Sequence, residues 1–446
     1  MKKILIVFVT IVILNSSFLI NNCLCQWVQQ PPYTLSFSFN RVHFLNWQIG
    51  YIAGAGGQIL KTVNYGANWV SQSTYTDLDV GNIFFFDFNT GFAICGSNIS
   101  NASKILRTIN GGFVWDLKYT GYQLVLTKGI HFINSNTGFA SGWSQNDSAI
   151  VKTTDGGWTW QKVKTNNIRS IDKFSFIDAN TGYAACYGTD SKPCLIKTTD
   201  GGVNWTKIYT HPTALKFTST YFINTNTGWV VGVSASNHSL IQKTTDGGVN
   251  WVEQVNHHPA NGKLNEIQML NENTGWIVGE ASQIVKTING GVNWRAQTTP
   301  AGLFSAVEFR GADTGYVAGY IGYDGLLLKT LNGGGPVSVQ NISTEVPSAY
   351  SLKQNYPNPF NPMTKIKFSL PLWRGEGGRT VQLFVYDVMG REVQTLVNDR
   401  LQPGTYETTF DGSMLPSGVY FYKLIVADPT GRTGDFTETK RMLMIK

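Results

Sequence analysis

One phrase recurs along the chain with a regular period, and this repeat constrains the fold more than any other feature. KTTDGGWTW at 152–160 returns as KTTDGGVNW at 197–205 and 243–251. Looser copies complete a series of tryptophans separated by 46, 45, 45, 46 and 43 residues: Trp69, Trp115, Trp160, Trp205, Trp251 and Trp294. A period of this length, with about four short apolar runs per unit, is typical of a β-propeller blade.

The two ends of the repeat region complement each other. The seventh copy, KTLNGGGP, ends in Pro336 and lacks the tryptophan, whereas Trp27 begins WVQQ, which resembles the WVSQ and WVEQ of later copies. We therefore predict a seven-bladed propeller over residues 26–336. Its last blade would take its outer strand from residues 26–31, because this pairing removes two exposed sheet edges.

The repeated phrase is interpreted as a structural corner. The Asp155 carboxylate can accept backbone N–H bonds within its own turn, the two following glycines allow positive φ, and the tryptophan packs between blades. Asn110, Asn289 and Asn332 replace the Asp in other copies, which keeps an acceptor but no general acid. The residues assigned to these turns are Asp155, Trp160, Asp200, Trp205, Asp246 and Trp251.

A second phrase, NTG followed by an aromatic strand, alternates with the first. Both turns would lie on one face of the ring, the Asp-box face. The opposite face, called the loop face, would carry the connections between second and third strands and between blades, where binding residues are expected. Aromatic candidates there, for sugar stacking or peptide anchoring, are Trp143, Tyr187, Tyr320 and Tyr323; covering neighbouring loops is the alternative role.

The phrase TTDGGWTW resembles the Asp-box, or BNR repeat, of sialidases and related glycosidases. The whole pattern over residues 26 to about 335 resembles the photosystem II assembly-factor family of seven-bladed propellers. This resemblance implies that the Asp-box lies away from the ligand face. It also keeps an Asp-box glycoside hydrolase as an alternative, for which two carboxylates would be needed across a cleft. The candidates are Asp79, Asp190 and Asp324.

Composition excludes several classes of partner. The formal net charge is +7, and Lys2 and Lys3 contribute two of these charges. The sequence contains no run of Lys and Arg residues, so it does not predict nucleic-acid binding. No cofactor or metal is expected, because the histidines show no HExxH or Cys/His spacing. Cys186 and Cys194 flank a short loop and could form a disulfide in an oxidising compartment; two buried thiols are the alternative. The histidines are His43, His131, His211, His238, His257 and His258.

The N-terminus predicts export. Lys2 and Lys3 precede an apolar run from Ile4 to Leu14, and a cut before Gln26 gives a signal peptide over residues 1–25. The run is too short to span a bilayer as a mature helix, and no other segment is long enough.

Residues 337–349 are predicted as a linker and residues 350–446 as a small immunoglobulin-like β-sandwich of alternating strands and Asn-Pro turns. The phrases QNYPNPFNP, YDVMGREV, LPSGVYFYKL and the basic ending KRMLMIK resemble the C-terminal sorting domain of type IX secretion substrates. The resemblance implies the type IX machinery as a partner and a secreted or outer-membrane surface location.

Together these features predict an all-β protein, secreted or displayed on the surface, whose propeller binds a glycan or a protein without catalysis. The alternatives are the Asp-box glycoside hydrolase and an extracytoplasmic assembly factor, as the photosystem resemblance suggests.

Overall fold

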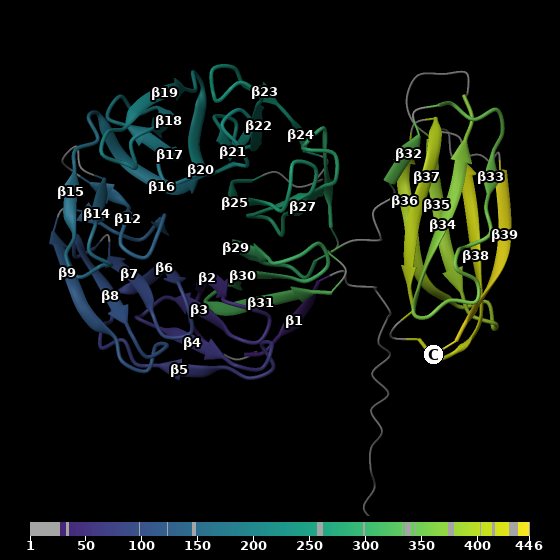
Figure 1. Ribbon diagram of the computed structural model, residues 1–446, viewed down its shortest axis with the longest axis horizontal. Helices are drawn as coiled ribbons and strands as arrows, with labels where there is room; N and C mark the ends of the chain where they lie inside the picture. The colour runs from purple at the N-terminus through teal and green to yellow at the C-terminus, as the bar shows by residue number, and fades with distance from the viewer. Residues whose placement is uncertain are drawn as a thin grey trace, which may run out of the picture.

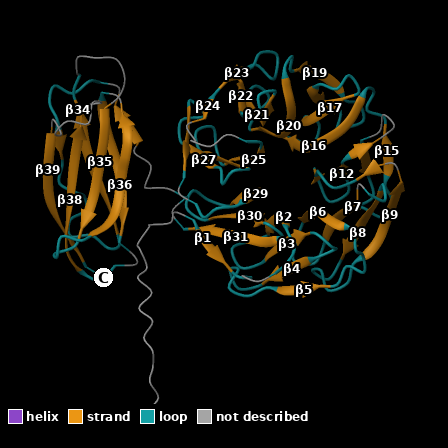
Figure 2. Ribbon diagram, turned by 180° about the vertical axis from the view of Figure 1, so that it is seen from behind, coloured by secondary structure: helices purple, strands orange, loops and turns teal. Residues whose placement is uncertain are grey.

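The computed structural model describes most of the chain after the predicted signal peptide, which itself lies outside the described residues. Described are residues 27–32, 35–97, 99–122, 124–144, 149–256, 262–297, 299–331, 333–334, 340–343, 345–372, 379–401, 403–412, 415–427 and 436–445. These residues form strands and turns, with no helix among them (Figures 1 and 2). The prediction of an all-β chain, a propeller followed by a β-sandwich, is confirmed.

The propeller region consists of seven sheets that follow one another around a ring (Figure 1). The first contains β2 (Phe39–Phe44), β3 (Gly50–Gly54), β4 (Ile59–Thr62) and β5 (Val70–Gln72); the second contains β6 (Asp79–Phe85), β7 (Gly91–Ser97), β8 (Ala102–Thr108) and β9 (Asp116–Tyr122); the third contains β11 (Ile130–Phe132), β12 (Gly138–Ser141), β14 (Ile150–Thr153) and β15 (Gln161–Val163).

The fourth sheet is enlarged at its inner edge, where β10 and β13 of the preceding repeat join it. It contains β10 (Leu124–Val125), β13 (Trp143–Ser144), β16 (Ile168–Phe176), β17 (Gly182–Gly188), β18 (Pro193–Thr198) and β19 (Thr206–Thr210); the fifth contains β20 (Ala214–Phe222), β21 (Gly228–Ser234), β22 (Ser239–Thr244) and β23 (Val252–Glu253). The sixth contains β25 (Leu264–Met269), β26 (Gly275–Gly279), β27 (Ile284–Thr287), β28 (Asn293–Ala296) and, parallel to β28, β24 (Val255–Asn256).

The last sheet closes the ring by combining both ends of the repeat region. It contains β29 (Leu303–Phe309), β30 (Gly315–Ile321), β31 (Asp324–Thr330) and β1 (Val28–Gln30). Val28 pairs with Lys329 in an antiparallel register, so the edge of β31 is covered. Trp27 is fully buried: its ring meets Phe309 edge-on at 5.7 Å and its Nε1 donates to Gln297 Oε1 at 2.8 Å.

Aromatic rings hold neighbouring sheets together. The aromatic residue of the second strand stacks on the last residue of the next inner strand, with ring centroids 3.8 Å apart for Tyr51 and Phe85. Tyr316 and Phe44 repeat the contact at 4.1 Å across the ring closure. The second strands are therefore buried on both faces, which explains their continuous apolar sequence. Other pairs are Phe92 with Phe132, Tyr183 with Phe222, and Trp276 with Phe309.

The C-terminal region is a sandwich of two antiparallel four-stranded sheets around one apolar core. The Tyr422 hydroxyl accepts the Asn355 N–H at 2.8 Å and donates to Lys353 O at 2.9 Å, which ties the QNYPNP segment to this core. The sheets contain β32 (Gln340–Ser343), β37 (Gly404–Asp411), β34 (Met363–Leu370) and β33 (Ser351–Leu352), and β36 (Glu392–Leu401), β35 (Arg379–Tyr386), β38 (Gly418–Ala427) and β39 (Phe436–Met444). β32 lies within the segment predicted as linker, and the domain limits remain predictions.

Trp27→Ala tests the closure. Because the side chain is fully buried between sheets, we expect the free energy of unfolding to fall by roughly 3–5 kcal/mol. Urea unfolding of the mature chain measures the change. Trp158→Ala is the control, since Trp158 is more than half exposed and should lose under about 1 kcal/mol. Equal losses in the two variants would contradict a closure that depends on Trp27.

Candidate functional site

The Asp-box turns are held by their own side chains. Asp155 Oδ1 accepts the Thr159 N–H at 3.0 Å, and Oδ2 accepts the Thr159 hydroxyl at 2.6 Å. Gly156 and Gly157 have φ of 71° and 80°, where glycine is favoured. The hydrogen bonds from Thr159 lower the pKa of Asp155 to about 2. The same geometry recurs with Asp200 and Asn204, and with Asp246 and Asn250.

The rest of the phrase contacts the neighbouring blade. Lys152 Nζ donates to Gly201 O in the next turn at 2.8 Å, and Lys243 does the same to Gly290 O. The tryptophan rings meet the last phenylalanine of an inner strand edge-on, in the pairs Trp160 with Phe132, Trp205 with Phe176 and Trp251 with Phe222. Each residue type in the turn therefore has a structural partner.

Two of the four aromatic candidates come together. Trp143 on β13 and Tyr187 on β17 both pair with Ser170 of β16, one on each side. Directly opposed residues share one face of a sheet, so the two half-buried rings flank a small serine. Tyr320 lies on β30 of the last sheet instead, and Tyr323 lies in the turn between β30 and β31, where it is 88% exposed.

Cys186 and Cys194 form a disulfide between β17 and β18, with Cα atoms 5.0 Å apart. This bond fixes the loop that follows Tyr187. Cys95 is a buried free thiol, and burial raises its pKa to about 12, so it is not a nucleophile at neutral pH.

The carboxylate candidates for hydrolysis are scattered. Asp79 accepts the Gly56 N–H at 2.9 Å, and Asp190 lies 3.4 Å from Lys207 Nζ. Asp79, Asp190 and Asp324 belong to the second, fourth and seventh sheets, which are not neighbours in the ring. The structure therefore does not bring any two of them together.

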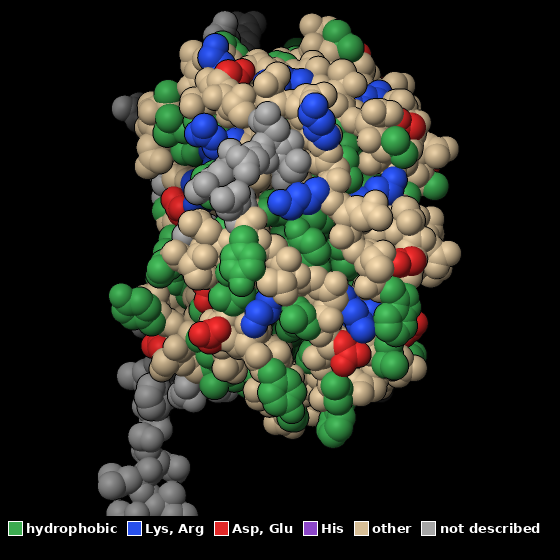
Figure 3. All heavy atoms as spheres, turned by 90° about the vertical axis from the view of Figure 1, so that its left-hand side faces the viewer, with side chains coloured by type: hydrophobic (Ala, Val, Ile, Leu, Met, Phe, Trp, Pro, Cys, Tyr) green, Lys and Arg blue, Asp and Glu red, His purple; other side chains and the backbone are tan. Residues whose placement is uncertain are grey.

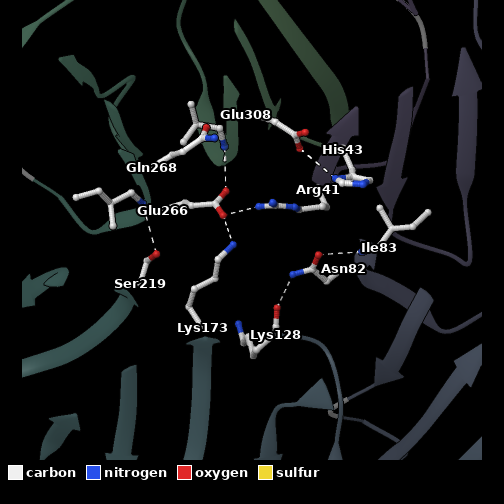
Figure 4. Close-up of polar contacts among 12 residues, drawn as sticks. Arg41, His43, Asn82, Ile83, Lys128, Lys173, Ser219, Glu266, Gln268 and Glu308 are labelled. Carbon is white, nitrogen blue, oxygen red and sulfur yellow. Dashed lines mark hydrogen bonds and ion pairs between the residues drawn. The ribbon is translucent and has the colours of Figure 1, made fainter. Parts of the chain in front are cut away.

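Charged side chains from different blades instead meet at the centre of the ring, which sequence reasoning missed. Arg41 of β2 and Lys173 of β16 both bind Oε1 of Glu266 on β25, and Figure 4 shows the three side chains pointing toward one another. Glu266 Oε2 accepts the Val307 N–H at 3.0 Å. Burial alone would raise the Glu266 pKa, but Arg41 and Lys173 outweigh it and lower the pKa to about 2.

Glu308 forms the second part of this central network. Its Oε1 accepts the Phe44 N–H at 2.9 Å, and its Oε2 lies 3.4 Å from His43 Nδ1. His43 Nε2 accepts the Phe85 N–H at 3.4 Å, and the imidazole faces Glu308 (Figure 4). Burial opposes ionisation of Glu308, but His43 and Arg41 lower its pKa overall.

Bulges explain how the inner strands direct polar groups to the centre. Each of six inner strands shifts register at the same place, and such a bulge re-aims side chains. The shifts lie at Phe39/Arg41, Val80/Asn82, Ile171/Lys173, Phe217/Ser219, Leu264/Glu266 and Phe304/Ala306. The available sequence signal was a charged residue three positions before the last residue of the inner strand, as at Arg41, Lys173 and Glu266.

A further group, here called the axial lysine cluster, contains Lys128, Asp172, Lys216, Lys263 and Glu280. Lys216 Nζ lies 2.9 Å from Asp172 Oδ1, and Lys263 Nζ lies 2.9 Å from Glu280 Oε1. Lys128 Nζ lies 4.0 Å from Asp172 Oδ1. The three lysines come just before or early in inner strands, and Glu280 follows β26, so the topology places the cluster toward the loop face.

The part of the outer side that Figure 3 shows has a mixed surface. Figure 3 views the side where β9 and β15 lie and shows acidic, basic and apolar side chains interspersed. Among the described residues, no group of His, Cys, Asp and Glu side chains is arranged to hold a metal ion; His257 and His258 lie outside them. Within the same ranges there is no helix long and apolar enough to cross a membrane.

Two family models match parts of the sequence. The photosynthesis system II assembly factor YCF48 model matches residues 210–298, and the secretion system C-terminal sorting domain model matches residues 354–430. The chain combines a YCF48-like repeat segment with a C-terminal sorting domain. No curated protein sequence matches it.

Solved structures show the fold of the YCF48-like region. YCF48 bound to D1 peptide is similar with a TM-score of 0.54 and 17% identity, covering 69% of this chain and 94% of that one. YCF48 from Cyanidioschyzon merolae is similar with a TM-score of 0.53 and 16% identity, covering 68% of this chain and 98% of that one. The Pan2 WD40 domain from Neurospora crassa is similar with a TM-score of 0.50 and 12% identity, covering 69% of this chain and 96% of that one. At these sequence identities the similarity shows that the region is a β-propeller, and no activity is inferred from it.

The central network predicts a pH dependence. Because the Glu266 pKa is about 2 in the folded protein against an ordinary value of 4.5, its stabilising contribution is complete above pH 4.5 and is lost as the pH falls toward 2. We expect Glu266→Gln to reduce the acid-dependent loss of unfolding free energy by roughly 2–3 kcal/mol.

Urea unfolding between about pH 5 and pH 2.5 measures this difference, with the exposed Glu253→Gln as the control. If Glu266→Gln does not fold, carboxyl ¹³C NMR of the unmodified protein reads the pKa directly. Titration of Glu266 near 4.5 would show that the network does not hold its charge.

Proposed function

We propose that the protein is exported through its sorting domain and that its propeller then binds a segment of another protein, without catalysis, on the loop face. The sorting domain at residues 354–430 points to secretion or the cell surface. The proposal adds to this a cleaved signal peptide over residues 1–25 and recognition of residues 350–446 by the type IX machinery.

The placement of the carboxyl groups supports the non-catalytic part of the proposal, because Asp79, Asp190 and Asp324 belong to repeats that are not neighbours in the ring. The direction of the pKa shifts agrees with this. Glycoside hydrolysis requires an acid whose pKa is raised so that it can donate a proton. Glu266 and Glu308, the buried acids of the central network, are shifted in the opposite direction by their cationic partners. Every other described carboxyl group with a shifted pKa is also lowered: Asp155, Asp178, Asp200, Asp246, Asp387 and Glu407.

Two observations support a binding surface on the loop face. Trp143 and Tyr187 flank Ser170 there, and a disulfide fixes the following loop, so aromatic anchors stand on a rigid support. Asp172 of the axial lysine cluster follows Ser170 by two residues on β16. Aromatic residues are enriched in protein interfaces, and polar groups surround them at the rim.

A protein segment is favoured over a glycan because a YCF48 propeller of the same fold has been solved with a bound peptide. Glycan binding and glycoside hydrolysis are the alternatives that experiment must separate. A periplasmic assembly factor is the third, and it requires a different location.

Fractionation of the native host tests the export step. Because a sorting domain directs transport across the outer membrane, we expect mass spectrometry to find the protein in the medium or at the cell surface. Its N-terminus should be near Gln26. Deletion of residues 350–446 should leave the propeller in the periplasm, with an unrelated periplasmic protein as the fractionation control. A full-length periplasmic protein in wild-type cells would favour the assembly-factor alternative.

Crosslinking on intact cells tests the binding step. We expect the double variant Trp143→Ala, Tyr187→Ala to reduce crosslinking to protein partners about tenfold, since aromatic anchors dominate binding energy. Trp158→Ala, on the Asp-box face, is the matched control. The purified protein is assayed in parallel on a panel of polysaccharides. Hydrolysis, or glycan binding that the double variant abolishes while protein crosslinks persist, would contradict the proposal.

A further inference from the structure

The axial lysine cluster contains more positive than negative side chains. Lys216 and Lys263 each have a carboxylate at 2.9 Å, whereas Lys128 is 4.0 Å from Asp172, which already binds Lys216. Three ammonium groups therefore share two carboxylates. The Lys128 side chain is also 48% exposed, so a ligand can reach it.

The lysines act on one another as well as on Asp172. Asp172 favours the protonated form of Lys128, but the burial of the other half of the side chain and the charges of Lys216 and Lys263 outweigh it and lower the Lys128 pKa. Like charges held together in this way are stabilised by an anion from outside the cluster. The cluster therefore favours an anionic ligand.

Asp172 supplies a second and independent indication. Its side chain is only 5% exposed, and its Oδ2 atom has no hydrogen-bond partner. A buried acceptor without a donor is costly, and most such atoms in folded proteins are satisfied. The ligand that fits this cluster therefore carries a hydrogen-bond donor close to its anionic group.

We infer that the axial lysine cluster binds an acidic residue of the protein segment, with Lys128 pairing with its carboxylate and Asp172 Oδ2 accepting a backbone N–H. One Asp or Glu residue offers both groups within a few ångströms, and charge-assisted hydrogen bonds are stronger than neutral ones. This inference rests on the proposed function and names the chemistry of its ligand. The position of Asp172, two residues beyond Ser170, lets the same segment reach Trp143 and Tyr187.

The central network does not offer the same opportunity. Glu266 is saturated by Arg41, Lys173 and the Val307 N–H, and it lies deeper along the inner strand. Glu308 Oε2 also has no hydrogen-bond partner, but it lies 3.4 Å from His43 Nδ1 within the buried network. The axial lysine cluster differs because it combines an unpartnered carboxylate oxygen with Lys128, a lysine that solvent can reach.

Fluorescence anisotropy with two dye-labelled Gly-Ser peptides of equal length tests the inference, one containing four glutamates and the other four glutamines. The mature full-length protein should bind the glutamate peptide about tenfold more tightly, because only this peptide carries anionic side chains. Higher salt should weaken that binding, as for any solvent-exposed ion pair.

Lys128→Gln should weaken binding of the glutamate peptide about tenfold, since it removes the ammonium group that has no close partner. Lys162→Gln is the matched control, because it removes the same charge from an exposed position on β15. Equal effects of the two variants would mean that only net charge matters and would overturn the site.

Asp172→Asn distinguishes the effect of the Asp172 negative charge from its role as a hydrogen-bond acceptor. It removes a negative charge, so binding by electrostatics alone would become tighter. If Oδ2 accepts a ligand N–H, binding should instead weaken several-fold, because a neutral amide accepts more weakly than a carboxylate. Thermal melting of each variant confirms folding, and a Lys216→Met, Asp172→Asn double variant replaces Asp172→Asn if that variant fails to fold.

A tetragalacturonate competitor distinguishes the ligand class. If it binds to wild type but not to Lys128→Gln, while the glutamate peptide does not bind, the cluster recognises an acidic glycan and the peptide inference is wrong. If neither probe binds but crosslinking still depends on Trp143 and Tyr187, the inference fails and the proposed function stands. Loss of both the probe binding and the protein crosslinks would overturn both.

Discussion

The innermost strand is a sheet edge in every sheet of the ring except the fourth, where β13 pairs with β16. The free backbone groups of such an edge need partners other than a neighbouring strand. Side chains of the preceding blade provide them by accepting an N–H from the last residue of the next inner strand. The pairs are Glu308 with Phe44, Ser175 with Phe222 and Gln268 with Phe309. Because Glu308 belongs to the last blade and Phe44 to the first, the same interaction also closes the ring. Polar residues at the centre are therefore required by the fold itself.

Some charged side chains at the centre serve these contacts between blades, and others remain free to contact a ligand. Glu266 and Glu308 accept backbone N–H groups and are neutralised by neighbouring cations, so their ionisation stabilises contacts between blades. Lys128 and Asp172 lie in a less complete environment, with one lysine at 4.0 Å and one carboxylate oxygen without a donor. Glu308 Oε2 also has no hydrogen-bond donor, so the exposure of Lys128, rather than the presence of charge or of an unpartnered oxygen, is what distinguishes the axial lysine cluster.

The sequence was sufficient for the fold because the blade is a local unit. The tryptophan period gave the sheets, and the likeness of WVQQ to later copies anticipated that β1 would pair with β31. The ring centre was not predictable in the same way. Arg41 and Lys173 lie 225 and 93 residues from Glu266, and a bulge, which has no clear sequence signature, turns all three inward. Likewise, Trp143 meets Tyr187 only because β13 pairs with the following blade.

The closure also makes binding and export physically separable. The ring is completed by β1, and its contacts with β31 involve residues 28–30 and 327–329. Trp27 and Phe309 pack at the same junction. Both residues come before the sandwich in the chain, so their contact does not depend on it. Loss of residues 350–446 would leave each of these strands in place. A propeller closed by its own N-terminal strand can therefore keep its loop face intact whether or not the sorting domain stays attached.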